Sequence, residues 1–240
     1  MEVFQMELFD FFRWDIIWNY RELYIKGIWA TIVLTLSGYL GGVFFGLFLG
    51  LGQVSKKKWI YWPCKIYVDV FRGTPMLVQL LLIHLAVIPT IFGQSMGWWV
   101  SGIVGLILNS AAYNAEIFRA GIQSIDKGQM EAARSLGLTH TQAMRKVILP
   151  QAFRRMIPPL GNEFIALLKD SSLVTVIAGA EILYVSKVVA GTYQRFWEPY
   201  LFAAFLYLVL TYLVTKLIAV VEKRVSIDYN PRKKKGRAET

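Results

Sequence analysis

The chain has 240 residues, of which 55% are hydrophobic, 15% aromatic and only 18% charged, and its net charge is +10. This balance is typical of an integral membrane protein and excludes a soluble globular domain. A basic chain could also bind nucleic acid, but these cations gather in a few short segments between long uncharged runs, as membrane loops do. We therefore expect the lipid bilayer as a partner and no nucleic acid.

Residues 4–24 alternate aromatic and charged side chains and are too polar to cross a bilayer. The pattern predicts an amphipathic helix that lies on the outer membrane interface. Glu2 and Glu7 stand where a cleavable signal peptide would carry positive charge, so we expect no such peptide.

Five hydrophobic segments follow, each long enough to cross a bilayer at about 20 residues per helix. They predict an all-α integral membrane fold in a single domain, with spans at about residues 27–55, 59–88, 98–118, 159–185 and 199–221. Pro89 and the turn-rich residues 92–97 are expected to separate the second span from the third. Thr74 and Pro75 are expected to break the second span locally.

Four glycines recur at every fourth position of the first predicted span, so they share one helix face: Gly38, Gly42, Gly46 and Gly50. Small residues at this spacing let another helix approach closely. Tight packing within one subunit is the favoured explanation, and a sliding or dimer contact is the alternative.

The distribution of Lys and Arg predicts the orientation. Seventeen of these residues lie around Lys56, between Arg119 and Arg155, and between Lys223 and Arg237, whereas five lie in the segments that alternate with these. The positive-inside rule then places the amino terminus outside and the carboxyl terminus in the cytoplasm, which requires an odd number of spans. The basic tail, residues 223–240, is expected to contact anionic lipid head groups.

Residues 119–157 form a polar and basic loop between the third and fourth predicted spans. Asp126 can cap a short helix through Leu136, and Gly137 can provide its left-handed exit. Thr139 and Gln142 can form a capping box that starts a second helix.

Three prolines follow this second helix. Pro150 is expected to stop it, and Pro158 with Pro159 is expected to prevent smooth continuation into the fourth span.

Within this loop, a set of residues resembles the EAA loop of bacterial ABC importer permeases: Glu131, Ala132, Ala133, Gly137, Leu149 and Pro150. Val147 stands where the family favours Ile. Residues 69–80 (DVFRGTPMLVQL) and 109–121 (NSAAYNAEIFRAG) are similar to the polar amino acid branch of these permeases, the histidine, glutamine and arginine type. The resemblance covers most of residues 25–222. A generic amphipathic loop helix would explain the EAA spacing, but not three such segments in the right order.

The resemblance implies the permease subunit of an importer in the bacterial cytoplasmic membrane, which translocates a polar amino acid. It implies that the EAA loop is a coupling helix seated on an ATP-binding subunit, and that two such subunits bind ATP and Mg. A second permease copy or a close relative, and an extracytoplasmic solute-binding protein, would complete the complex.

The chain itself shows no signature of catalysis or of a cofactor. It has no Gly-x-x-x-x-Gly-Lys-[Ser/Thr] segment, so it lacks a phosphate-binding loop and is not expected to hydrolyse ATP or to be an enzyme. Its one cysteine, Cys64, and its two histidines, His84 and His140, have no metal-ligand spacing, and His84 is interpreted as a packing residue. We expect no cofactor or metal in this chain.

Charged and polar residues inside the predicted spans are the candidates for a substrate pathway: Asp69, Arg72, Thr74, Asn109, Tyr113, Glu116, Lys169 and Asp170. Such groups are costly in hydrocarbon and are expected to face a polar cavity or each other. Arg72 could bind the carboxylate of an amino acid, and Asp170 or Glu116 its ammonium, which would suit a basic amino acid. Equally, Asp69 with Arg72, and Lys169 with Asp170, could neutralise each other locally and fix helix packing.

Two other functions fit a membrane protein with charged spans. An ion-coupled secondary transporter of amino acids is the main alternative, although five unequal spans with no internal repeat count against it. A membrane scaffold is a third interpretation, which the charges within the spans disfavour because packing alone has little need for them.

Overall fold

The computed structural model describes residues 12–225, and the regular structure in this range is entirely helical. The helices are α2 (Trp14–Asn19), α3 (Arg21–Gln53), α4 (Lys58–Gly73), α5 (Met76–Leu82), α6 (Ile88–Phe92), α7 (Gly97–Gln123), α8 (Lys127–Ser135), α9 (His140–Ala143), α10 (Leu149–Asp170), α11 (Ile182–Tyr193) and α12 (Trp197–Val225). Two π-helical turns, Ile83–Val87 and Met144–Ile148, and a 3-10 segment, Ser171–Ile177, join neighbouring helices.

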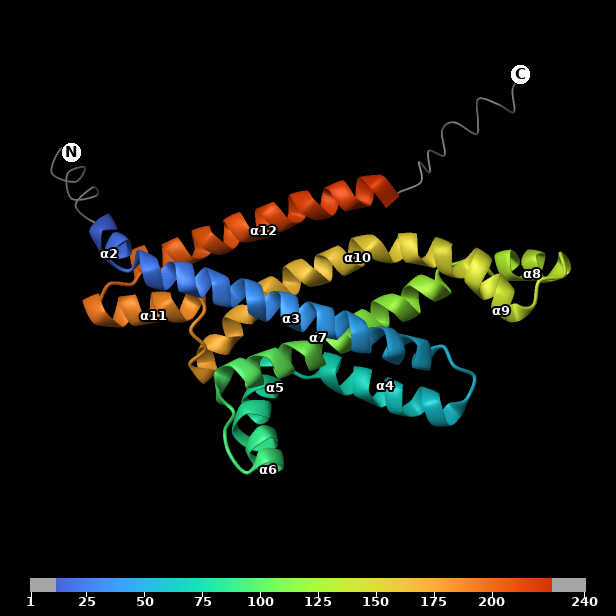
Figure 1. Ribbon diagram of the computed structural model, residues 1–240, viewed down its shortest axis with the longest axis horizontal. Helices are drawn as coiled ribbons and strands as arrows, with labels where there is room; N and C mark the ends of the chain where they lie inside the picture. The colour runs from blue at the N-terminus through green and yellow to red at the C-terminus, as the bar shows by residue number, and fades with distance from the viewer. Residues whose placement is uncertain (1–11, 226–240) are drawn as a thin grey trace, which may run out of the picture.

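The long helices define the shape of the molecule. In Figure 1, α3, α7, α10 and α12 run along the long axis, with α8 and α9 at one end and α2 and α11 at the other. The segment α5–α6 turns away from this axis.

Helix α3 packs lengthwise against α7 along the four regularly spaced glycines. A Cβ atom added to Gly42 would lie 2.5 Å from the Ser110 Oγ, and one added to Gly46 would lie 2.7 Å from the Asn114 Cβ. Because nothing larger than hydrogen fits there, the two backbones approach closely. The explanation of these glycines by packing within one subunit is thus confirmed.

Length and apolarity identify fewer spans than the sequence predicted. Among the described residues, α3 and α12 are each long and apolar enough to cross a membrane, and α4 with α5–α6 and the helical run His140–Ile177 with α11 qualify as bent pairs. Helix α7 has 27 residues, but it carries Asn109, Ser110 and Asn114, which are buried. Since α7 contacts α3, α4 and α10, these polar groups face protein. The five-span topology therefore stays a prediction, and it requires that α7 crosses the membrane.

The second predicted span is bent by 107° between α4 and α5. The break at Thr74 and Pro75 was predicted and is confirmed. The expected separation in residues 92–97 is confirmed, since α6 ends at Phe92 and α7 begins at Gly97. The contribution expected of Pro89 is wrong, because Pro89 lies in the first turn of α6 and the helix continues past it. Gly93, with a φ of +73°, ends it.

The second loop helix was predicted to stop at Pro150, but helical structure runs from His140 through the 3-10 segment. The helix that contains the start of the fourth predicted span, expected at residues 159–185, accordingly begins before residue 159, and the helical run bends by 47° before α11. A π-helical turn ends two residues before Pro150, and another ends two residues before Pro89. Such a turn shifts the backbone hydrogen bonds, so the missing N–H and the proline ring are tolerated.

Pro158 and Pro159 lie inside α10 and do not interrupt it, against the prediction. Both are exposed, as are Arg154 and Arg155 four residues earlier, whose carbonyl groups lose their helical donors. Water can satisfy carbonyl groups at such an exposed position, which explains why the helix persists.

At the amino-terminal end, part of the predicted amphipathic helix, residues 4–11, lies outside the described residues, as do residues 226–240 of the basic tail. The remainder divides between α2 and the first turns of α3. Ile16 and Ile17 pack against Val185 and Val189, while Trp14 and Trp18 are exposed. The short helix α2 is therefore amphipathic, and its apolar side lies in a cluster with residues of α3, α11 and α12.

Candidate functional site

The loop between α7 and α10 starts with a capped helix. Asp126 accepts a hydrogen bond from the Gly128 N–H at 2.6 Å and begins α8. At the other end, the Gly137 N–H donates to the Arg134 carbonyl at 3.0 Å and the Leu138 N–H to the Ala133 carbonyl at 3.2 Å. This is a Schellman motif, and Gly137 has the left-handed φ of +85° that it requires. The predicted cap and exit are confirmed.

Helix α9 begins with the predicted capping box. The Gln142 N–H donates to the Thr139 Oγ1 at 3.3 Å, and the Thr139 N–H donates to the Gln142 Oε1 at 2.8 Å. Both bonds satisfy N–H groups that have no partner within the helix. The loop is therefore a well-defined helix–turn–helix unit.

This unit is fixed to the ends of α7 and α10. Buried Ile125 and Ile148 pack with Phe118 of α7 and Met156 of α10 in one apolar cluster. Arg155 also donates to the Ser124 carbonyl at 2.5 Å. The unit is therefore anchored to both helices through a packed apolar cluster.

The structure divides the predicted coupling residues into two groups. Glu131, Ala132, Gly137, Leu149 and Pro150 are exposed, whereas Ala133 is buried against the chain's own residues.

Leu136 was not among the predicted residues, yet 84% of its surface is exposed. A large apolar residue directly before the glycine of a helix exit, in an otherwise polar loop, is the sequence signal that could have identified it. Large exposed apolar side chains mark contact surfaces.

Polar residues at the bend between α4 and α5 form a second group. The Gln79 side-chain amide donates to the carbonyl groups of Phe71, at 2.7 Å, and Thr74, at 3.0 Å. It also donates to the Thr74 hydroxyl at 2.8 Å, and the Thr74 hydroxyl donates to the Val70 carbonyl at 2.8 Å. Asn109 of α7 donates to the Gln79 Oε1 at 2.9 Å. The predicted pathway residues Thr74 and Asn109 thus stabilise the break, with Gln79, which sequence reasoning missed.

Arg72 interacts with α7. Its guanidinium lies 3.6 Å from the Glu116 carboxylate and 5.5 Å from the centre of the Tyr113 ring. Asp69 instead forms an ion pair with Lys65 at 2.8 Å. The predicted local pair of Asp69 with Arg72 is therefore wrong, because α7 offers the guanidinium both a carboxylate and an aromatic face.

Glu116 has a second cationic partner. The Arg119 Nε donates to it at 3.0 Å, and the Arg119 Nη2 donates to its other oxygen. Its charge is thus largely compensated within the chain.

Glu163 of α10 is a pathway candidate that sequence reasoning missed. It accepts a hydrogen bond from the Ser110 hydroxyl at 3.3 Å, and Asn114 donates to the same hydroxyl at 2.9 Å. The charges of Arg72 and Asp170 also act on the Glu163 carboxylate. A single acidic residue in the hydrophobic run 160–168 was the available signal.

Asp170 lies seven residues after Glu163, on the same face of α10. It is half-buried, whereas Lys169 is exposed. In residues 12–225 no hydrogen bond or ion pair joins Lys169 to Asp170, since consecutive residues of a helix point in different directions. The Lys169 charge still acts on the Asp170 carboxylate, so local neutralisation stays an alternative.

A second missed carboxylate, Glu181, is fully buried at the bend before α11. It accepts from the Leu183 N–H at 3.0 Å, from the Tyr184 N–H at 2.8 Å and from the Thr175 hydroxyl at 2.5 Å. The Tyr207 hydroxyl of α12 also donates to it. This carboxylate caps α11 and connects the bend to α12.

The histidine of the second span has a packing role, as predicted: the His84 Nδ1 lies 2.8 Å from the Ser101 hydroxyl of α7. Within the described part of the chain, no group of three His, Cys, Asp or Glu side chains could hold a metal ion.

Comparison with known proteins agrees with this arrangement. Residues 42–227 match the family model described as "Binding-protein-dependent transport system inner membrane component". One relative is the probable amino-acid ABC transporter permease protein YckA of Bacillus subtilis (strain 168), which is 36% identical, and the match covers 88% of this chain and 96% of the relative. Another is the L-cystine transport system permease protein TcyB of the same organism, which is 37% identical, and the match covers 88% of this chain and 91% of the relative.

A solved structure shares the same fold. The crystal structure of an amino acid ABC transporter with histidines has a chain that is 43% identical, with a TM-score of 0.83, and the match covers 89% of this chain and 99% of that one.

These matches decide against the two alternative functions, a secondary transporter and a membrane scaffold. The chain belongs to the family of binding-protein-dependent transport system inner membrane components and is a multi-pass inner-membrane permease subunit of an amino acid ABC importer, in which a separate subunit is the ATPase.

Proposed function

We propose that this permease couples ATP hydrolysis to transport through α8, Gly137 and α9. The observation that carries the proposal is the exposed surface of this unit, with Glu131, Ala132 and Leu136 outside, on a base that is packed into α7 and α10. An ATPase subunit that binds the exposed surface of this unit would move α7 and α10 together. The chain has no phosphate-binding loop, so the energy must arrive through such a contact.

The same two helices carry the proposed substrate pathway. Arg72 of α4 lies over the Tyr113 ring of α7, and the charges of Arg72 and Asp170 act on the Glu163 carboxylate of α10; we call these four residues the polar cluster. Arg72 can bind the carboxylate of an amino acid, and Glu163 with Asp170 its ammonium groups. Because the cluster holds two carboxylates and one arginine, it favours a polar amino acid with a basic side chain. The similar crystal structure is that of an amino acid ABC transporter with histidines, and histidine is consistent with this class.

The remaining candidates have supporting roles in this proposal. Thr74 and Asn109 hold the bend beside Arg72, and Glu116 orients Arg72. Asp69 pairs with Lys65, and Lys169 acts on the charge of Asp170. Arg72 and Tyr113 are exposed on one subunit. A second permease, identical or closely related, would enclose them.

For the complete importer we propose five spans, with α7 as the third, the amino terminus outside and the carboxyl terminus in the cytoplasm. Two ATPase subunits, which bind ATP and Mg, would dock on the two coupling units, and a solute-binding protein would deliver the amino acid from outside. Closure of the ATPase pair would then switch the pathway from inward to outward facing.

Replacement of Gly137 tests the coupling role. A Cβ atom at this position meets nothing within 4 Å, so the permease can accommodate a side chain, at a strain of about 1 kcal/mol from the left-handed backbone. We expect Gly137→Asp to remain in the membrane but to lose the ATPase, or to keep it without driving uptake. Pull-down of the ATPase and ATP-dependent uptake would be measured on one preparation.

The matched control is Gly137→Asn, since asparagine tolerates the left-handed conformation without adding charge. If both variants lose ATPase binding or uptake, any side chain at this position obstructs the contact surface. If only Gly137→Asp loses them, the added charge or a distorted turn is the cause. Normal ATPase binding together with normal uptake in Gly137→Asp would refute the coupling role.

A further inference from the structure

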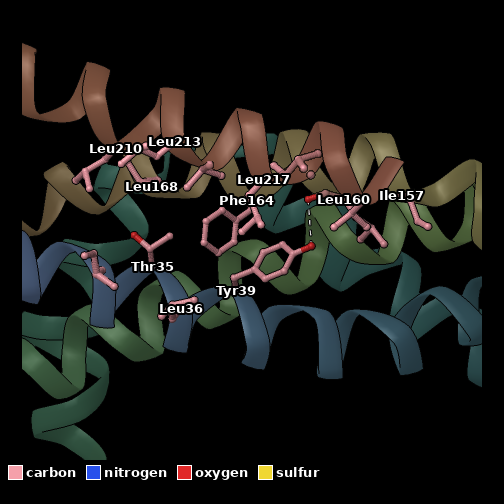
Figure 2. A pocket seen from close by; sticks show the side chains of 15 residues that line it. Thr35, Leu36, Tyr39, Ile157, Leu160, Phe164, Leu168, Leu210, Leu213 and Leu217 are labelled. Atoms are coloured by element: carbon pink, nitrogen blue, oxygen red, sulfur yellow. Dashed lines mark hydrogen bonds between the residues drawn. The ribbon is translucent and has the colours of Figure 1, made fainter. Parts of the chain in front are cut away.

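An apolar groove with a volume of about 570 Å³ lies between α3, α10 and α12. Figure 2 shows Tyr39 of α3, Phe164 of α10 and Leu217 of α12 on its walls. The two hydroxyl groups of its lining are already bonded: Thr35 donates to the Thr31 carbonyl at 2.7 Å, and Tyr39 donates to the Leu160 carbonyl at 3.1 Å. The groove therefore offers a polar solute no free partner and suits a hydrocarbon chain.

The length of the groove matches one leaflet of a bilayer. Along α12 it extends from Leu210 to Val221, which is about 16 Å at 1.5 Å per residue. Half of a hydrocarbon core of about 30 Å has nearly the same depth. Leu213 and Leu217 on its rim are largely exposed, so a chain can enter from the side.

Two arginines stand just beyond the end of the groove nearest to α8 and α9. Arg154 precedes the lining residue Ile157 by three positions, and Arg224 follows the lining residue Val221 by three. Residues three apart on a helix share a face, so both cations lie on the side of the groove. Both are exposed, and neither forms an ion pair with an acidic residue between positions 12 and 225.

We propose that this groove binds an acyl chain of an anionic phospholipid, whose phosphate group lies between Arg154 and Arg224. The lipid belongs to the leaflet on the same side as α8 and α9. Calling this leaflet cytoplasmic rests on the orientation given under the proposed function, but the lipid site itself does not. Each arginine should favour an anionic over a zwitterionic lipid by about fivefold.

Photo-crosslinking in lipid nanodiscs tests the site. The full-length chain, purified with the subunits that stay bound to it, would receive phosphatidylglycerol with a diazirine on its acyl chain, or phosphatidylcholine with the same chain. We expect phosphatidylglycerol to label peptides containing Phe164 and Leu217 at least about fivefold more strongly. Mass spectrometry would locate the labels.

Charge variants separate the head group from the chain. Arg154→Gln with Arg224→Gln should lower labelling by phosphatidylglycerol to the level of phosphatidylcholine. Lys26→Gln with Lys187→Gln, two exposed cations at the opposite end of the molecule, should leave it unchanged. Equal labelling by the two lipids in the parent chain, or an unchanged preference in the arginine variant, would overturn the anionic head group.

Steric variants test the groove itself. Val214→Trp places a large ring in the groove and should abolish labelling of its walls, while Leu208→Trp, on the opposite face of α12, should not. If Val214→Trp does not fold, the arginine variants decide alone. Labels confined to surfaces outside the groove, or a disulfide between two copies of a Leu213→Cys variant that excludes the lipid, would show that no lipid occupies it.

Discussion

The side chain of Gln79 replaces backbone hydrogen bonds that the bend between α4 and α5 removes. It bonds to two carbonyl groups and is itself held by Asn109, which is buried. In a membrane every backbone polar group needs a partner within the protein. A polar residue in an apolar span can therefore act by satisfying backbone hydrogen bonds. This role explains why Asn109 is polar without requiring a contact between Asn109 and the solute.

Glu163 and Glu116 differ in how far the chain compensates their charge, and this leads to a prediction. Glu163→Gln keeps the shape of the side chain but removes a charge that can bind an ammonium group. A charge-assisted hydrogen bond contributes roughly 1.5–3 kcal/mol, so we expect uptake of arginine or lysine to fall by roughly 10- to 100-fold, and uptake of glutamine much less.

The matched control is Glu116→Gln, which removes a partner of Arg72 and Arg119 and should impair all amino acids alike. Competition between arginine and glutamine for uptake into proteoliposomes measures both variants. An equal loss for the two solutes in Glu163→Gln would contradict the selective role.

Each bent helix pair is stabilised by one buried polar side chain. Gln79 does this at the first bend, and Glu181 at the second, where Ala178 has a left-handed φ of +59°. Both side chains bond to backbone groups near the bend and to a side chain of another helix, Asn109 or Tyr207. The bends are thus built features of the fold, fixed in direction by long-range contacts.

The contact of α3 with α7 allows a second prediction. In Gly46→Ala the new methyl group would lie 2.7 Å from the Asn114 Cβ and 2.9 Å from the Ala111 carbonyl oxygen, so the helices must separate. Overpacking of this kind costs about 1–3 kcal/mol. We expect a lower midpoint of thermal unfolding in detergent.

Gly191→Ala in α11 is the control, because nothing lies within 4 Å of its added Cβ atom. Alanine is the better helix former by about 1 kcal/mol, so the midpoint should stay or rise. A midpoint for Gly46→Ala equal to that of the parent would show that this seam can relax.

At the scale of the whole molecule, α7 and α10 connect the proposed coupling unit to the polar cluster. The unit is packed on Ile125 and Ile148 at their ends, while Tyr113 and Glu163 lie further along the same two helices. In the proposed mechanism, a displacement of the unit reaches the cluster along these two helices. This geometry requires that α7 itself crosses the bilayer.

Cysteine labelling tests that requirement. In a Cys64→Ser background, Ser95→Cys precedes α7 and Thr141→Cys lies in α9, and both positions are exposed. If α7 crosses, a membrane-impermeant maleimide should label Ser95→Cys in intact cells and Thr141→Cys only after permeabilisation. Labelling of both from the same side would eliminate α7 as a span, and with it the five-span topology.

The sequence by itself determined features whose interacting groups lie a few residues apart. Asp126 caps α8 through Gly128, Thr139 and Gln142 cap α9, and Gly137 adopts its left-handed φ, because each conformation depends on local sterics and local hydrogen bonds. Composition, charge and the lack of a phosphate-binding loop likewise need no fold to be recognised.

Only the tertiary structure decided which distant groups meet. Arg72 faces Glu116 rather than Asp69, and Gln79 lies beside Asn109, since these partners come from different helices. Pro150 does not end its helix, because the preceding π-helical turn and the packing of Ile148 outweigh its local preference. A buried contact stabilises the fold by more than the helix propensity of a single residue does. Which residues form that contact depends on how the helices pack.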